Sequence, residues 1–107
     1  MPKRLKRYEI LLPLKYNDGT EVEQGKFHET RGELIDRFGA VTIEPVPSKG
    51  FWLNNEDILY EDILVRFRLD IKNTWGNRRF ITKYKEILKE RFKQIDIWLT
   101  SYEIEVI

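Results

Sequence analysis

The chain has 107 residues, of which 41% are hydrophobic and 35% are charged, and its formal net charge is +1. This balance is typical of one globular domain, so we expect residues 1–107 to form a single domain. No apolar run reaches the ~18 residues that a membrane-spanning helix requires. Cysteine is absent, which excludes disulfides, thiolate catalysis and cysteine metal ligands. We expect a cytoplasmic location and no membrane partner.

The first third of the chain predicts a strand followed by a helix. Residues 1–7 are rich in Lys and Arg, and we expect them to form a flexible basic tail. Residues 8–16 alternate between apolar and other positions, which is the pattern of a half-buried strand. A turn follows at residues 17–19, and Thr20 with Glu23 fits a capping box that would start the first helix. Gly39 is placed to end that helix.

The middle of the chain predicts two strands. One begins at Ala40 and stops near Pro45 and Pro47, and residues up to Asp57 form a loop or a hairpin arm that turns at Asn54 and Asn55. Residues 59–71 are the clearest strand. Phe67 and its alternate neighbours would face the helices, and the residues between them would face the other side of the sheet.

The last third predicts a second helix and strand. Thr74 would cap the helix, and its inward stripe would consist of Phe80, Tyr84, Leu88 and Phe92, with Ile81 and Ile87 beside it. A strand would begin at Ile95, and its alternation shifts after Leu99, which indicates a bulge or a short fifth strand. Residues 88–97 also repeat the pattern of residues 34–43, in which Phe92 and Phe38 occupy matching positions.

The order strand, helix, strand, strand, helix, strand predicts a fold of the α+β class. With right-handed crossovers, this order gives a ferredoxin-like βαββαβ domain, a four-stranded antiparallel sheet with two helices on one face. The other face stays open. A sheet with one uncovered face must meet water, a second subunit or a ligand.

The open face is the candidate functional surface. Its predicted anchors are Leu11, Leu64 and Trp98, which lie among charged residues. We expect a self-associating binding or regulatory module, most simply a homodimer, in which cross-pairing sets the register. The charged residues predicted to pair are Arg66, Arg68, Asp70 and Asp96. The alternative is an ordinary exposed sheet with scattered apolar residues.

Two other functions remain open. Arg66, Arg68 and the basic residues of the second helix could serve a nucleic acid, but an RNA recognition motif needs outward aromatics and a glycine in this strand. The segment LVRFRLDI (64–71) turns Phe67 inward and has no glycine, which favours solvated or ion-paired arginines. The other function is a cofactor-free enzyme of the dimeric α+β-barrel type, with Trp52, Trp75 or His28 near a pocket between sheet and helices.

The sequence contains no recognisable catalytic, metal or cofactor motif. His28 is the sole histidine, and without defined partners it is best interpreted as a surface or half-buried residue. The carboxylates show no metal-loop spacing, although Asp18 after the first strand is the position where a magnesium ion could be held. We therefore predict no catalytic residue, no metal and no cofactor.

Four segments of the chain resemble a family of small uncharacterised bacterial proteins. They are RYEILLPLKYNDG (7–19), RFGAVTIEP (37–45), LYEDILVRF (59–67) and LKERFKQIDIWLTSYEIEVI (88–107). The last segment is the most distinctive part of the resemblance. The resemblance implies a small ferredoxin-like protein of bacterial origin, but it implies no activity, so no functional residue follows from it.

Overall fold

The computed structural model describes residues 2–44 and 48–107, except the side chains of residues 48–50 and 60–62. Five strands and two helices follow one another along the chain in these residues. The strands are β1 (Lys3–Pro13), β2 (Thr42–Ile43), β3 (Ser48–Leu53), β4 (Leu59–Ile71) and β5 (Leu99–Val106). The helices are α1 (Gln24–Phe38) and α2 (Trp75–Arg91).

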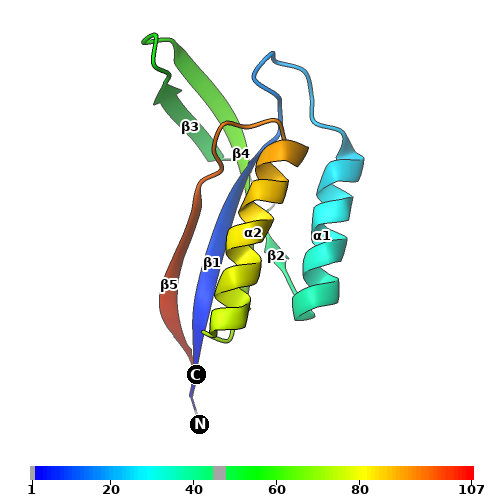
Figure 1. Cartoon of the computed structure of the whole chain (residues 1–107), viewed down its shortest axis with the longest axis vertical. Coiled ribbons are helices and arrows are strands. Elements are labelled where there is room, and N and C mark those ends of the chain that lie inside the picture. Colours follow the sequence, from blue (N-terminus) through cyan, green and yellow to red (C-terminus); the bar gives the residue numbers. More distant parts are fainter. Residues whose placement is uncertain (1, 45–47) are drawn as a thin grey trace.

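The strands form one antiparallel sheet in the order β2-β4-β1-β5, and β3 also pairs with β4. Both helices lie on the same side of this sheet (Figure 1). β2 and β3 lie along the same edge of β4, so together they take the place of one edge strand. The predicted ferredoxin-like α+β fold is therefore confirmed, with its second strand divided in two.

β1 is longer than the sequence suggested. Residues 3–7, predicted as a flexible tail, belong to this strand, so that prediction was wrong. Lys3 pairs with Val106 and Leu5 with Ile104, and β5 therefore gives the basic N-terminal segment a hydrogen-bonding partner. A prediction from local composition misses such a partner because it lies about a hundred residues away in the sequence.

The start of α1 differs from the prediction, whereas its end agrees with it. The predicted capping box was wrong, because Thr20 donates its N–H and hydroxyl to Asp18 and the helix begins one residue after Glu23. Glu23 instead accepts a hydrogen bond from the Tyr16 hydroxyl. The predicted stop is confirmed, since Gly39 adopts a left-handed conformation with a φ of 85°.

α2 follows the prediction except at one position. Thr74 caps the helix and accepts a hydrogen bond from the Asn77 N–H at 3.1 Å. Ile81, Tyr84 and Leu88 are buried, whereas Ile87, which was predicted to lie beside the inward stripe, is exposed. Ile87 precedes Leu88, and one residue turns an α-helix by about 100°, so its side chain points away from the core.

The strand predicted from Ile95 begins four residues later, at Leu99. A loop precedes it, and β5 then runs to Val106 without a break. The additional short strand that the sequence indicated after Leu99 is therefore absent from the described part of the chain. The loop joins the sheet through the Leu11 N–H, which donates to the Trp98 carbonyl at 3.0 Å. The strand predicted from Ala40 was expected to stop near Pro45 and Pro47, and these two prolines lie outside the described residues.

The core lies between the sheet and the two helices. It consists of Tyr8, Ile10, Leu12, Tyr16, Val22, Leu34, Phe67, Leu69, Ile71, Ile81, Tyr84, Leu88, Phe92 and Ile97. The strand alternation predicted for β1 and β4 is confirmed where the helices cover the sheet, because the core includes Tyr8, Ile10 and Leu12 of β1 and Phe67, Leu69 and Ile71 of β4. Among the described residues, no helix is long and apolar enough to span a membrane.

Candidate binding site on the open sheet face

The open face of the sheet, which is turned away from the helices, has an apolar end and a charged end. On β4, Leu64 and Asp70 mark these two ends, and the strand alternation turns the residues at even positions between them to the same face. Each lies opposite a residue of β1. The pairs are Pro13 with Leu64, Leu11 with Arg66, Glu9 with Arg68, and Arg7 with Asp70.

The apolar end contains a pocket of about 470 Å³. The three predicted anchors, Leu11, Leu64 and Trp98, all line it. The other lining residues are Pro13, Phe51 and Trp52, together with residues 94–97 of the loop that follows α2. We call this set the apolar pocket. Three backbone pairings create it, because β1, the β3–β4 hairpin and the α2–β5 loop meet there.

Several side chains at the apolar pocket remain in water. Trp98 is 68% exposed, Ile95 is 78% exposed and Phe51 is 62% exposed. Each of these side chains would contribute about 1.5–3 kcal/mol if it were fully buried. The pocket therefore combines a hollow with apolar side chains that stand in solvent beside it.

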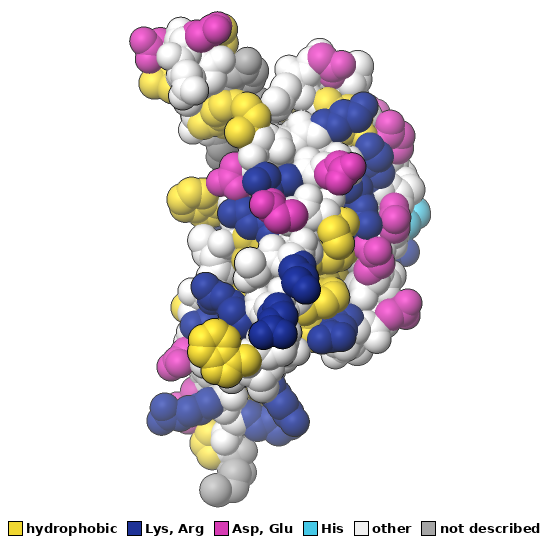
Figure 2. All heavy atoms as spheres, viewed as in Figure 1, with side chains coloured by type: hydrophobic (Ala, Val, Ile, Leu, Met, Phe, Trp, Pro, Cys, Tyr) yellow, Lys and Arg dark blue, Asp and Glu magenta, His cyan; other side chains and the backbone are white. Residues whose placement is uncertain are grey.

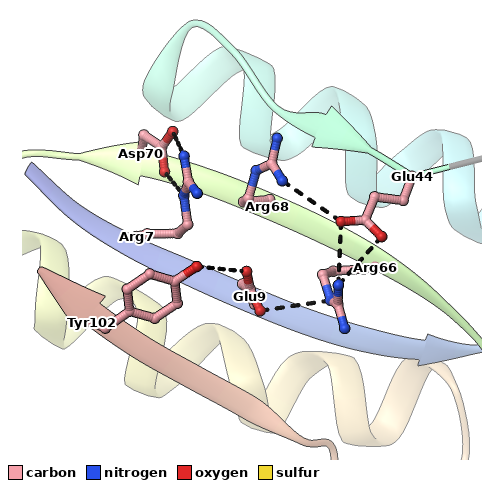
Figure 3. A network of polar contacts seen from close by, with 7 residues as sticks. All are labelled: Arg7, Glu9, Glu44, Arg66, Arg68, Asp70 and Tyr102. Atoms are coloured by element: carbon pink, nitrogen blue, oxygen red, sulfur yellow. Dashed lines mark hydrogen bonds and ion pairs between the residues drawn. The ribbon is translucent and has the colours of Figure 1, made fainter. Parts of the chain in front are cut away.

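The charged end is an ion-pair network (Figure 3). Arg7 donates two hydrogen bonds to Asp70, at 2.7 and 2.9 Å. Arg66 lies 3.6 Å from Glu9 and 3.3 Å from Glu44, and Arg68 lies 3.6 Å from the same Glu44 carboxylate.

We call these six residues, Arg7, Glu9, Glu44, Arg66, Arg68 and Asp70, the open-face network. Tyr102 of β5 borders it and donates its hydroxyl hydrogen to Glu9 at 3.1 Å. Three cations face three anions, so the network is neutral. It links β1 and β4 with the end of β2.

The Arg7–Asp70 pair has the shortest contact of the open-face network. Hydrogen bonding to Arg7 holds the pKa of the Asp70 carboxyl below its usual value. The same hydrogen bond raises the pKa of the Arg7 guanidinium. Both groups therefore stay ionised at neutral pH, and the geometry is a two-bond contact between guanidinium and carboxylate.

The two arginines of β4, Arg66 and Arg68, have hydrogen-bond donors that lack an acceptor in the described part of the chain. The Nε atoms of Arg66 and Arg68 are buried and have no hydrogen-bond partner among the described residues. Glu44 is shared between the two guanidinium groups, which leaves too few carboxylate oxygens in good geometry for all their donors. This sharing holds both side chains against the sheet, where they are less than one-third exposed.

Two of the predicted pairings differ in the structure. Asp70 pairs with Arg7, which the sequence analysis placed in a flexible tail. Asp96 does not lie in the open-face network. It pairs with Lys85 of α2 at 3.0 Å, and hydrogen bonding to Lys85 lowers the pKa of the Asp96 carboxyl. Asp96 was misplaced because the sequence analysis began the last strand at Ile95.

The remaining candidate residues, with the exception of Trp52, lie apart from the pocket. Trp52 lines it, but His28 and Trp75 are exposed on α1 and at the start of α2. Asp18 is occupied by hydrogen bonds from Thr20. No group of three or more His, Asp or Glu side chains is placed to hold a metal ion in residues 2–44 and 48–107, side chains 48–50 and 60–62 aside.

The pairing partners Arg7, Glu9 and Glu44 were not predicted from the sequence. Glu9 and Arg7 were recognisable in principle, since they alternate with Tyr8 and Ile10 on β1 and so must face the open side. Glu44 follows a strand of two residues, which is too short for its register with β4 to be inferred from an alternating pattern.

The geometry defines the class of this protein as a ferredoxin-like domain with an apolar pocket and a neutral ion-pair network on its open face. No family model matches the sequence, and the search of curated proteins found no match. The resemblance to small uncharacterised bacterial proteins therefore stays a prediction.

One solved structure with a similar fold is a phage SAM lyase in complex with S-methyl-5′-thioadenosine. It has a TM-score of 0.69 and 14% sequence identity, and the match covers 94% of this chain and 88% of that one. A likeness at this level of identity concerns the fold alone.

Proposed function

We propose that the protein is a self-associating binding module and that a second copy of the chain covers the apolar pocket. The observation that carries this proposal is the convergence of Leu11, Leu64 and Trp98 on one pocket beside apolar side chains left in water. Exposed apolar side chains gathered around a hollow are typical of an interaction surface.

A second copy suits this surface because the surface carries both a hollow and exposed apolar side chains beside it. In a two-fold contact the same patch lies on both sides, so the protruding side chains of one chain meet the hollow of the other. Here Trp98, Ile95 and Phe51 are the exposed side chains and the pocket is the hollow. Such packing would remove apolar area from water on both chains at once.

The open-face network supports the same partner. Because its three arginines are matched by three carboxylates, two identical faces can approach without like-charge repulsion. A nucleic acid is a poorer partner for this face, since binding of phosphates depends on an excess of positive charge. The ion-paired arginines thus favour assembly over a nucleic-acid platform at this site.

The mass in solution tests this proposal directly. We expect the parent protein to have a mass of two chains or more at tens of micromolar, measured by light scattering. The double variant Trp98→Ser, Ile95→Ser removes exposed apolar side chains beside the pocket and should shift the protein toward one chain. Ile87→Ser is the matched control, because Ile87 is an exposed apolar residue on α2 that does not line the pocket. A parent protein with the mass of one chain would contradict the proposal.

A second candidate is a small-molecule site in the same pocket. Its volume of about 470 Å³ falls in the range of ligand pockets, and two indole rings line it. The similar phage SAM lyase was solved with S-methyl-5′-thioadenosine, which makes that nucleoside a reasonable probe. Quenching of tryptophan fluorescence by the nucleoside in a monomeric parent, lost in Trp98→Ser, would favour this candidate over assembly.

A further inference from the structure

The β3–β4 hairpin forms an arm that extends beyond the two helices (Figure 1). The tip of the arm, residues 51–59, turns through Asn54, whose side chain accepts hydrogen bonds from the N–H groups of Glu56 and Ile58. Leu53 and Leu59 lie opposite each other across the hairpin and so share one face. Both are exposed, as is Ile58. The arm therefore carries apolar side chains that this chain does not cover.

The arm is also acidic. Residues 51–65 contain four acidic residues and no basic one. Two of the acidic residues, Glu56 and Asp57, are exposed in the turn, where neither has an ion-pair partner among the described residues. A partner for this tip should accordingly offer positive charge and at least one large apolar side chain.

The beginning of α2 offers these features. Residues 72–85 contain five basic residues and no acidic one. Trp75 is 88% exposed, and the spacing of the helix places Arg78, Arg79 and Lys83 near it, on the side opposite the buried Ile81 and Leu88. We call Lys72, Trp75, Arg78, Arg79 and Lys83 the basic patch. The part of the chain that the structure describes provides no ion-pair partner for any of its four cations.

The arm and the basic patch lie toward opposite ends of the molecule. In Figure 2, acidic and hydrophobic side chains occupy the arm, and Lys and Arg side chains gather around a hydrophobic one over the first turns of α2. One chain cannot bring these two surfaces together, because its longest dimension is 49 Å and they lie far apart along it.

We propose that the arm of one chain docks on the basic patch of another copy, with Leu53, Ile58 and Leu59 against Trp75 and with Glu56 and Asp57 among Arg78, Arg79 and Lys83. The contact is head to tail, and it leaves an arm and a patch free at the two ends of a pair. It would therefore extend an assembly into a ring or a row. This inference rests on the proposed function, since it adds a second contact to a chain that already self-associates through the apolar pocket.

Charge reversal on each surface tests the contact. The patch variant is Arg78→Glu, Arg79→Glu. The arm variant is Glu56→Lys, Asp57→Asn, in which asparagine is chosen because Asp57 has a φ of 60° and asparagine tolerates that conformation. The control is Arg31→Glu, Lys15→Glu, which changes the net charge as much as the patch variant does at two exposed residues elsewhere.

The parent protein should assemble beyond two chains at low salt, and raising the salt should weaken this step. Each reversal variant should stop at the mass that the pocket contact sets, with the head-to-tail step weakened at least tenfold, whereas the control should match the parent. Mixed in equal amounts, the two variants should regain the larger mass, since one supplies an intact arm and the other an intact patch.

Three results would overturn the head-to-tail contact. If the parent is a simple dimer that neither variant changes, only the pocket contact exists and the proposed function stands. If the parent is one chain, both proposals fail. If the patch variant instead loses affinity for a single-stranded DNA of mixed sequence that the arm variant retains, the patch is a nucleic-acid site.

Discussion

Two segments of the chain with the same pattern have different surroundings. Residues 34–43 and 88–97 each run from the end of a helix toward a strand, and Leu34 and Leu88 are both fully buried. The resemblance ends at the matched phenylalanines. Phe92 is fully buried, whereas Phe38 is only partly buried against the core. Residues of the same type at matching positions are therefore buried to different extents between the helices and the sheet.

The matched arginines differ even more. Arg37 is exposed and lies over the Phe80 ring, 4.7 Å from its centroid. The side chain of Arg91 is only 10% exposed and reaches α1, where it contacts Glu33 at 2.7 Å and the Thr30 hydroxyl at 2.8 Å. One copy of the pattern ends at the surface, and the other supplies the polar link between the helices. The surroundings, and not the repeated residues, decide these roles.

The largest difference should appear at the two phenylalanines. We expect Phe92→Ala to lower the free energy of unfolding by about 3–5 kcal/mol, because it would leave a cavity in a closed part of the core. Phe38→Ala should cost about half as much, since solvent already reaches that side chain. Urea unfolding followed by far-UV circular dichroism measures both. Equal losses would mean that the two copies are energetically equivalent after all.

A smaller difference is expected at the two arginines. Arg91→Met keeps the length of the side chain but removes the donor to the Thr30 hydroxyl and the cationic partner of Glu33, and it should cost about 1–3 kcal/mol. Arg37→Met should cost less than about 1 kcal/mol, because it removes exposed contacts with the Phe80 and Phe38 rings. The same unfolding experiment provides the comparison, and a greater loss at Arg37 would contradict it.

The sequence could predict whatever depended on local periodicity. The alternation of β4 gave its buried and open faces, and the positions of Thr74 and Gly39 gave one helix start and one helix end. These features are set by neighbours within a few residues, as the pleat of a strand and the caps of a helix require. The anchors Leu11, Leu64 and Trp98 were assigned to one face, and they do line one pocket.

The predictions that failed depended on contacts between distant segments. Residues 3–7 belong to β1 because β5 pairs with them, and Asp96 turns to Lys85 because the loop after α2 is longer than the apolar pattern suggested. Arg91 has the same local sequence context as Arg37, so its burial could not be inferred from the repeat. The partner of a charged residue is a property of the tertiary fold, which a single sequence read by period does not specify.

The smallest expected effect concerns the pH dependence of the link between the helices. Hydrogen bonding to Arg91 lowers the pKa of the Glu33 carboxyl below its ordinary value of 4.5, and the Tyr84 hydroxyl also donates to it. A carboxyl whose pKa is lowered by folding stabilises the protein above its unfolded-state pKa, and that contribution is lost as the pH falls through the folded-state value. Arg37 occupies the matching position in residues 34–43, and it has no ion pair among the residues that the structure describes. We therefore expect no comparable pH-dependent contribution from Arg37.

The variant Glu33→Gln isolates this contribution, because it removes the ionisable group and keeps a side chain of the same shape. At pH about 7 the parent should be more stable than Glu33→Gln, and the gap should close as the pH is lowered below 4.5, where the carboxyl becomes protonated. Because Glu33 is partly open to solvent, the gap should be small and should shrink with added salt. Thermal unfolding across this pH range, with Asp36→Asn as the control for an exposed acid on the same helix, measures it. A gap that stays constant with pH would show that Arg91 holds Glu33 by shape and not by charge.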